Sequence, residues 1–142
     1  MTDEVGRTQD AGFQIGVSKT LPYPAEQVWE FLTDDDGVAL WLGAGAELSP
    51  EKGAPYRTDE GTEGEVRSYR PPDRVRVTYR PAAWDHDTTV QVAIRAAGEK
   101  TMLRFHQEWL ADAEERGRQR EHWRAVMAAV EEGLAASGSD AS

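Results

Sequence analysis

The sequence contains no cysteine, and this absence excludes several kinds of site. A chain without cysteine forms no disulfide, no thiolate metal centre and no cysteine nucleophile. Its three histidines are scattered and lack the His-x-x-x-His helix spacing of a zinc site. The acidic run 34–36 lacks the spaced oxygen ligands and terminal glutamate of a calcium-binding loop. The sequence therefore predicts neither a metal nor a cofactor.

Long apolar runs and an excess of basic charge are missing too. No run approaches the ~18 apolar residues that a membrane span needs, and the polar, acidic N-terminus is unlike a signal peptide. We therefore expect a cytoplasmic protein. The formal net charge of -10, from 16 basic and 26 acidic residues, disfavours nucleic acid and anionic membranes as partners. The negative charge favours solubility, with docking of a basic protein as the alternative.

The chain is long enough for one folded domain. It has 142 residues, and its five tryptophans argue against disorder. We expect a disordered tail over 1–12, a single domain over 13–136 and a polar tail over 137–142.

A long C-terminal helix is predicted over 112–136. Asp112 and Glu115 form a possible capping box, and Gly138 lies where a helix stop is expected. The apolar residues recur at helical spacing and give one narrow apolar face: Trp123, Val126, Met127, Val130 and Leu134.

The preceding sequence predicts an antiparallel sheet. A strand over 13–21 is followed by a helix from Pro24 to Thr33 and a short helical piece ending at Trp41-Leu42. A weak strand is expected around 54–58, then four strands over 64–69, 74–80, 88–96 and 100–110, with short turns that imply a meander. Because the exposed edge of this meander could pair with a second copy, the sequence does not decide between a monomer and a weak homodimer.

The strands alternate between apolar and polar residues, so one face of the sheet is expected to be covered and the other wet. The C-terminal helix is the natural cover, which gives an α+β arrangement. The predicted inward residues are Val75, Val77 and Tyr79, then Val90, Val92 and Ile94, then Leu103, Phe105, Gln107 and Trp109.

This order of elements, with its local motifs, resembles the helix-grip fold of the START-like, or SRPBCC, superfamily. The similar motifs are the proline–helix opening with Val28-Trp29, Trp41-Leu42 closing the second helix, Gly64-Glu65-Val66, the Pro-rich turn at 71–75, the strand at 101–105 and His122-Trp123. Together they resemble the branch named after the activator of the heat-shock-protein-90 ATPase. Two positions depart from the family pattern: His122 replaces a glycine, and Gln107 stands where many relatives have histidine.

The resemblance implies a hollow between sheet and helix that holds a hydrophobic molecule. Some superfamily members are cyclases or hydrolases, and the branch name reflects a co-chaperone domain. Trp41, Tyr79, Trp84 and Trp109 are expected at the mouth of this hollow. The full predicted ligand-binding set is Trp41, Tyr56, Val66, Val77, Tyr79, Trp84, Val92, Phe105, Gln107, Trp109, Trp123, Met127 and Val130. For each of these residues, plain core packing is the alternative interpretation.

Gln107 and the histidines are the candidate polar groups. An inward amide either bonds to neighbouring protein groups or recognises a polar group of a ligand. His86, between Asp85 and Asp87, could act as a general base but is expected in a solvated turn. His106 is expected on the surface, and His122 at the edge of the apolar helix face.

Three functions remain open from the sequence. The first is non-catalytic binding of a small hydrophobic or amphipathic molecule, as a carrier or sensor. The second is a co-chaperone-like protein-interaction domain. The third is a cyclase or hydrolase that uses Gln107, Tyr79 or the His86 loop. The sequence contains no Gly-x-Ser-x-Gly elbow, phosphate loop or dinucleotide fingerprint, which favours the non-catalytic interpretation.

Overall fold

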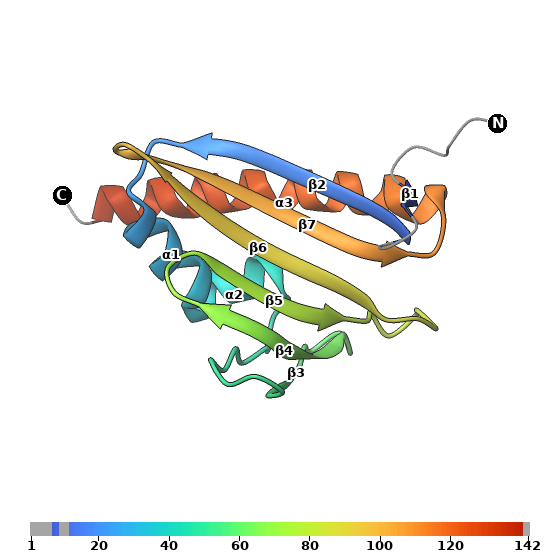
Figure 1. Cartoon of the computed structure of the whole chain (residues 1–142). Helices are drawn as coiled ribbons and strands as arrows, with labels where there is room; N and C mark the ends of the chain where they lie inside the picture. The colour runs from blue at the N-terminus through green and yellow to red at the C-terminus, as the bar shows by residue number, and fades with distance from the viewer. Residues whose placement is uncertain (1–6, 9–11, 141–142) are drawn as a thin grey trace.

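A seven-stranded antiparallel sheet with one long helix along it forms the framework of the structure (Figure 1). The structure, a computed structural model, describes residues 7–8 and 12–140, with side chains over 13–136. In chain order the elements are β1 (Arg7–Thr8), β2 (Gly12–Leu21), α1 (Ala25–Thr33), α2 (Asp35–Trp41), β3 (Pro55–Arg57), β4 (Glu63–Arg70), β5 (Arg74–Tyr79), β6 (Thr88–Ala97), β7 (Lys100–Leu110) and α3 (Ala113–Asp140).

The strands follow the spatial order β1-β2-β7-β6-β5-β4-β3. The predicted meander is therefore confirmed over β4 to β7, with β2 added beside β7 and the weak strand β3 at the far edge. Helix α3 packs on β2 and β7, while α1 contacts β6, β7 and α3. None of the helices described is long and apolar enough to cross a membrane.

The apolar face of α3 lies against the sheet as its spacing predicts. Trp123, Val130 and Leu134 are fully buried, and Val126 and Met127 are nearly so. The β-strand alternation is confirmed in the same way, because Val77, Val92 and the other predicted inward aliphatic side chains lie in the core. Burial of this apolar face stabilises the helix, whose opposite side is charged.

The two short helices are fixed by polar contacts at their junction. Asp34 ends α1 and caps α2, since its side chain accepts a hydrogen bond from the Gly37 backbone N–H at 2.8 Å. The Trp41 indole N–H donates to the carbonyl oxygen of Leu32 at 2.8 Å. Trp41 is only 1 % exposed, so it lies deep in the core and away from any mouth. Its predicted place at the entrance is wrong.

Two element boundaries differ from the prediction. The helix continues through Gly138 to Asp140, because a glycine weakens a helix by only about 1 kcal/mol and need not end it. The predicted N-terminal tail contains β1, which pairs with β2 through Arg7 and Phe13. The rest of that predicted tail, 1–6 and 9–11, and the last residues 141–142 lie outside the described residues.

Trp109 points away from the helix, contrary to the predicted alternation. Phe13 pairs with Leu110 and Ile15 with Gln107, so Gln14 alone faces both Glu108 and Trp109. This extra residue in β7 is a bulge, and Trp109 takes up the left-handed backbone conformation with φ 68°. The side chain is 47 % exposed, while Leu110 takes the inward place. The predicted inward role of Trp109 is wrong because alternation does not anticipate a bulge.

Two glycines of α3 give a stability prediction with its own control. A Cβ at Gly133 would lie 2.3 Å from Cζ of Phe31, whereas a Cβ at Gly117 would meet no described atom within 4 Å. Alanine normally stabilises a helix over glycine by about 0.5–1 kcal/mol, but overpacking costs about 1–3 kcal/mol. We expect Gly117→Ala to raise the free energy of unfolding and Gly133→Ala to lower it by about 1–2 kcal/mol. Urea denaturation measures both, and an equal gain for the two variants would contradict this packing.

Candidate functional site

A buried hydrogen-bond network joins the sheet to α3. The Gln107 side-chain nitrogen donates to the Thr88 hydroxyl at 2.9 Å, and this hydroxyl donates to the Tyr79 carbonyl oxygen at 2.6 Å. The Gln107 side-chain oxygen accepts hydrogen bonds from the Trp123 indole N–H and the Gln119 amide, both at 2.9 Å. Gln107 is 0 % exposed, and both its side-chain nitrogen and its side-chain oxygen are hydrogen-bonded to protein groups. These bonds favour the interpretation in which the Gln107 amide pairs with neighbouring protein groups.

Aromatic rings continue from this network to the surface. The Trp123 ring stacks on Phe105, with centroids 5.1 Å apart and an interplanar angle of 20°. Tyr79 contacts Trp123 at 6.4 Å, and Trp84 meets Tyr79 edge-on at 6.3 Å. Trp84 is half-buried, whereas the other three rings lie in the core. The aromatic row, defined as Trp84, Tyr79, Trp123 and Phe105, therefore leads from the surface into the space between sheet and helix.

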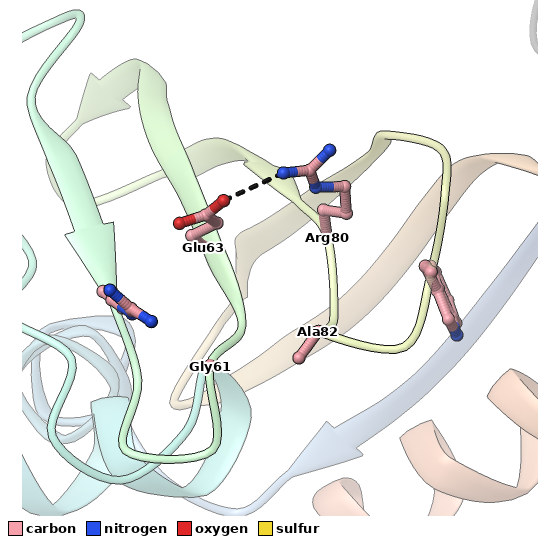
Figure 2. Close-up of a pocket in the computed structure, with 6 residues that line it drawn as sticks. Gly61, Glu63, Arg80 and Ala82 are labelled. Carbon is pink, nitrogen blue, oxygen red and sulfur yellow. Dashed lines mark hydrogen bonds and ion pairs between the residues drawn. The ribbon is translucent and has the colours of Figure 1, made fainter.

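A hollow of about 300 Å³ lies at the surface end of the aromatic row. Figure 2 shows Glu63 and Arg80 joined on one side of it, while the segments that carry Gly61 and Ala82 face each other. A Cβ at Gly61 would lie 3.1 Å from the Ala82 Cβ, so small residues keep this space free. The hollow is lined by Arg57, Gly61, Glu63, Arg80, Ala82 and Trp84.

The loop that carries Trp84 is fastened to the start of α3 by His86. The His86 ring stacks on Trp84 at 5.0 Å with an interplanar angle of 7°. Its Nε2 lies 2.8 Å from Glu115 Oε2, and its Nδ1 lies 3.1 Å from Asp85 Oδ1. The same Glu115 oxygen accepts the Ala111 backbone N–H at 2.7 Å. His86 lies in a turn, as predicted, but its side chain is only 26 % exposed, because the ring stacks on Trp84 and faces Glu115.

The surroundings of His86 favour its protonated form. Burial acts to lower the pKa of His86, but the hydrogen bonds and charges of Asp85 and Glu115 outweigh it and raise the pKa. The hydrogen bond from His86 is also the main cause that lowers the pKa of Asp85. Both ring nitrogens are engaged, so the arrangement suits a fastening ion pair better than a general base.

This ion pair gives a pH prediction whose sign follows from the raised pKa. The stabilisation by protonated His86 is fully present below its unfolded pKa of about 6.5 and is lost as pH rises through the folded value. We expect His86→Gln to lower the free energy of unfolding more at about pH 5.5 than at about pH 8.5. His106 and His122, whose pKa values burial lowers, remain in both proteins, so their titration cancels. An equal loss at the two pH values would contradict the ion pair.

Two buried tyrosines flank the site as neutral donors. Burial is the main cause that raises the pKa of both Tyr56 and Tyr79, and the charge of Glu60 adds to the effect on Tyr79. The Tyr56 hydroxyl donates to the carbonyl oxygen of Thr78 at 2.5 Å and lines a second hollow at the edge of the sheet. Both phenols remain protonated at neutral pH, which makes them hydrogen-bond donors and not bases.

The predicted ligand-binding residues thus fall into four groups. Trp84 lines the hollow, with Tyr79 directly behind it. Tyr56 borders the second hollow. Trp41 and Trp109 lie elsewhere, in the deep core and on the outer face. The remaining predicted residues are core residues between sheet and helix: Val66, Val77, Val92, Phe105, Gln107, Trp123, Met127 and Val130.

The sequence did not single out the polar residues that shape the hollow. Arg57, Glu63 and Arg80 look like ordinary charged positions on short strands, and no local spacing marks them. Glu115 was identified only as part of a capping box. The structure confirms the Asp112 half of that box, since its side chain accepts the Glu115 backbone N–H at 2.8 Å. Within the described ranges, no group of three or more acidic or histidine side chains could hold a metal ion.

Several solved structures share this fold. DynU16, from the dynemicin biosynthetic locus, is 22 % identical with a TM-score of 0.75 over 85 % of this chain and 46 % of its own. The chain therefore spans less than half the length of DynU16. PFC0360w, an HSP90 activator from Plasmodium falciparum, is 18 % identical with a TM-score of 0.66 over 78 % of this chain and 86 % of its own.

A third solved structure has a similar fold. The Aha1 dimer from Colwellia psychrerythraea is 16 % identical with a TM-score of 0.70 over 85 % of this chain and 95 % of its own. These likenesses confirm the predicted helix-grip fold. Among curated proteins, no match to this chain was found.

The family assignment comes from the sequence match, which begins at Pro22, just before α1, and ends at Ala136 in α3. It covers 22–136, and so includes β7, both hollows and all residues of the aromatic row. The chain belongs to the family described as Activator of Hsp90 ATPase homolog 1-like protein.

Proposed function

We propose that this protein binds a small hydrophobic or amphipathic molecule without transforming it, as a carrier or sensor. The observation that carries the proposal is the aromatic row, which joins the hollow at Trp84 to Trp123 in the interior. Tryptophan and tyrosine supply flat apolar surface together with a polar group that can orient a ligand. Small-molecule sites combine concave apolar surface with a few polar groups, and here Trp84 and Ala82 supply the apolar surface while three charged side chains supply the polar groups.

The proposed seat is the hollow at Trp84, whose lining residues come from β3, β4 and the loops before β4 and after β5. Deeper in, Gln107 and Trp123 are fully buried and hydrogen-bonded to each other, so a ligand there would have to break that contact. At the hollow, Trp84 is only half-buried and Ala82 and Gly61 present no large side chain. DynU16 comes from a biosynthetic locus, which suits a small-molecule role, although its low identity supports the fold alone.

Titration with the fluorescent, uncharged probe N-phenyl-1-naphthylamine tests this seat. Ala82→Leu places three further carbons in the hollow, whereas Ala83→Leu adds the same group at an exposed neighbour outside the lining. We expect Ala82→Leu to weaken probe binding about tenfold, or about 1.4 kcal/mol, and Ala83→Leu to leave it unchanged. Equal binding by the wild type and Ala82→Leu would rule out the hollow as the seat.

A protein partner is the second candidate, and Trp109 favours it. This side chain is 47 % exposed on the outer face of the sheet. The backbone of Trp109 is in the left-handed conformation, which costs a non-glycine residue conformational free energy. Tryptophan is one of the residue types that contribute most of the binding energy in protein contacts. Because PFC0360w is an HSP90 activator, the test is stimulation of an HSP90 ATPase by the wild type and by Trp109→Ala. No stimulation by the wild type would reject this candidate.

Catalysis by a cyclase or hydrolase has less support from the geometry. His86 is engaged at both nitrogens, the Gln107 amide bonds to protein groups, and the pKa of Tyr79 is raised. Enzymes of this kind need two polar groups converging on one reacting atom. The double variant Gln107→Ala with Tyr79→Ala would abolish any turnover that depends on them.

A further inference from the structure

We infer that the hollow recognises an acidic group, so that the molecule it takes is a planar amphipathic anion. This inference rests on the proposed function and specifies the chemical class of the ligand. Its basis is Arg57, a lining residue whose guanidinium has no ion pair among the described residues. The planar guanidinium of arginine can donate two parallel N–H hydrogen bonds to the oxygens of a carboxylate, sulfonate or phosphate group.

The second arginine of the hollow is already neutralised. Arg80 donates to Glu63 at 2.9 Å, and its Nε lies 3.9 Å from an Asp87 carboxylate oxygen. Backbone hydrogen bonds between Glu63 and Arg80, at 3.1 and 3.0 Å, hold the same pair together. The ion pair of Arg80 and Glu63 therefore forms one wall of the hollow and has little net charge with which to attract a ligand.

Arg57 remains uncommitted although a carboxylate lies across from it. The register of β3 and β4 pairs Arg57 with Glu63, but the Glu63 carboxylate bonds to Arg80 instead. Glu63 and Asp87 both lie against Arg80, so Arg57 is the charged lining residue that no carboxylate among the described residues pairs with. Its guanidinium is therefore available to an acidic group of a ligand.

The backbone around Arg57 is held in place. Its neighbour Tyr56 is buried and bonded to the carbonyl oxygen of Thr78, which anchors β3 beside β4. The hollow also contains Trp84, whose ring can take the flat apolar part of a ligand while Arg57 takes its acidic group. The small side chains of Gly61 and Ala82 leave room for such a ligand.

Two probes that differ in one acidic group test this inference. The first is 8-anilinonaphthalene-1-sulfonate, and the second is N-phenyl-1-naphthylamine, the same ring system without the sulfonate. Both are titrated against the folded wild type, Arg57→Gln and the matched control Arg70→Gln. Arg70 is likewise exposed, on β4, but lies outside the lining of the hollow.

We expect Arg57→Gln to weaken binding of the sulfonate about threefold to tenfold and to leave binding of the uncharged probe within about twofold. Arg70→Gln should change neither. Added salt should also weaken binding of the sulfonate probe to the wild type, and it should weaken binding of this probe to Arg57→Gln less.

The failure of this inference differs from the failure of the proposed function. If Arg57→Gln binds both probes as the wild type does, the anionic class is overturned, while the effect of Ala82→Leu on the uncharged probe still decides the seat. If Arg57→Gln weakens both probes equally, the arginine acts on the shape of the hollow and the anionic class is again overturned. If Ala82→Leu binds both probes like the wild type, the proposed seat itself is wrong.

Discussion

Replacing Trp123 by alanine is expected to lower the free energy of unfolding by about 3–5 kcal/mol. The ring is 0 % exposed, stacks on Phe105 and contacts Tyr79, so its removal leaves a cavity between the sheet and α3. It also removes the indole N–H that donates to Gln107, which leaves a buried amide oxygen with fewer partners. Urea or thermal unfolding measures the loss.

Two further variants separate the causes of this loss. Trp123→Phe keeps a ring against Phe105 but removes the N–H donor, and we expect a smaller cost of about 1–3 kcal/mol. Met102→Ala truncates a side chain that is 41 % exposed on the opposite face, and we expect a change below about 1 kcal/mol. Losses of similar size for Trp123→Ala and Met102→Ala would contradict the packing described between sheet and helix.

Replacing Glu115 by alanine is expected to lower the free energy of unfolding by about 2–3 kcal/mol at about pH 6. This carboxylate is 5 % exposed and accepts hydrogen bonds from the Ala111 backbone and from His86. Its removal leaves the Ala111 backbone N–H, just before α3, without this acceptor and releases the contact between α3 and His86 in the Trp84 loop. Hydrogen bonds to charged groups are the stronger ones, which sets the expected size.

The adjacent residue Glu114 provides the control for Glu115. Its side chain is 84 % exposed and forms a surface ion pair with Arg118 in the next turn, so Glu114→Ala should change stability by less than about 0.5 kcal/mol. Glu115→Gln keeps an oxygen for the Ala111 N–H but removes the charge that faces His86, and an intermediate loss is expected. Equal losses for Glu114→Ala and Glu115→Ala would contradict the fastening role.

The arrangement of sheet and helix could be predicted because its cause is local and periodic. The spacing of Trp123, Met127 and Val130 predicts one buried helix face, and the alternation of Val75, Val77 and their neighbours predicts one covered sheet face. The inward position of Gln107 follows from the same alternation. These features depend only on neighbours within one element, and sequence periodicity reports such neighbours.

The site could be predicted only in part because its contacts join distant residues. Glu115 meets His86 across 29 positions, and Thr88 meets Gln107 across 19. No local pattern predicts such pairs, so His86 was expected in solvent. The outward position of Trp109 was not predicted for another reason. One extra residue in β7 reverses the face of the sheet toward which its side chain points.

Native mass spectrometry of the protein purified from its own host tests small-molecule binding most directly. Wild type and Ala82→Leu are compared, each beside a denatured sample. We expect the wild type to carry a small additional mass that leaves on denaturation, and Ala82→Leu to lack it, because leucine fills the hollow. An additional mass carried equally by both proteins would place the ligand elsewhere. The bare chain mass for both, together with no binding of either naphthyl probe, would contradict a carrier or sensor function.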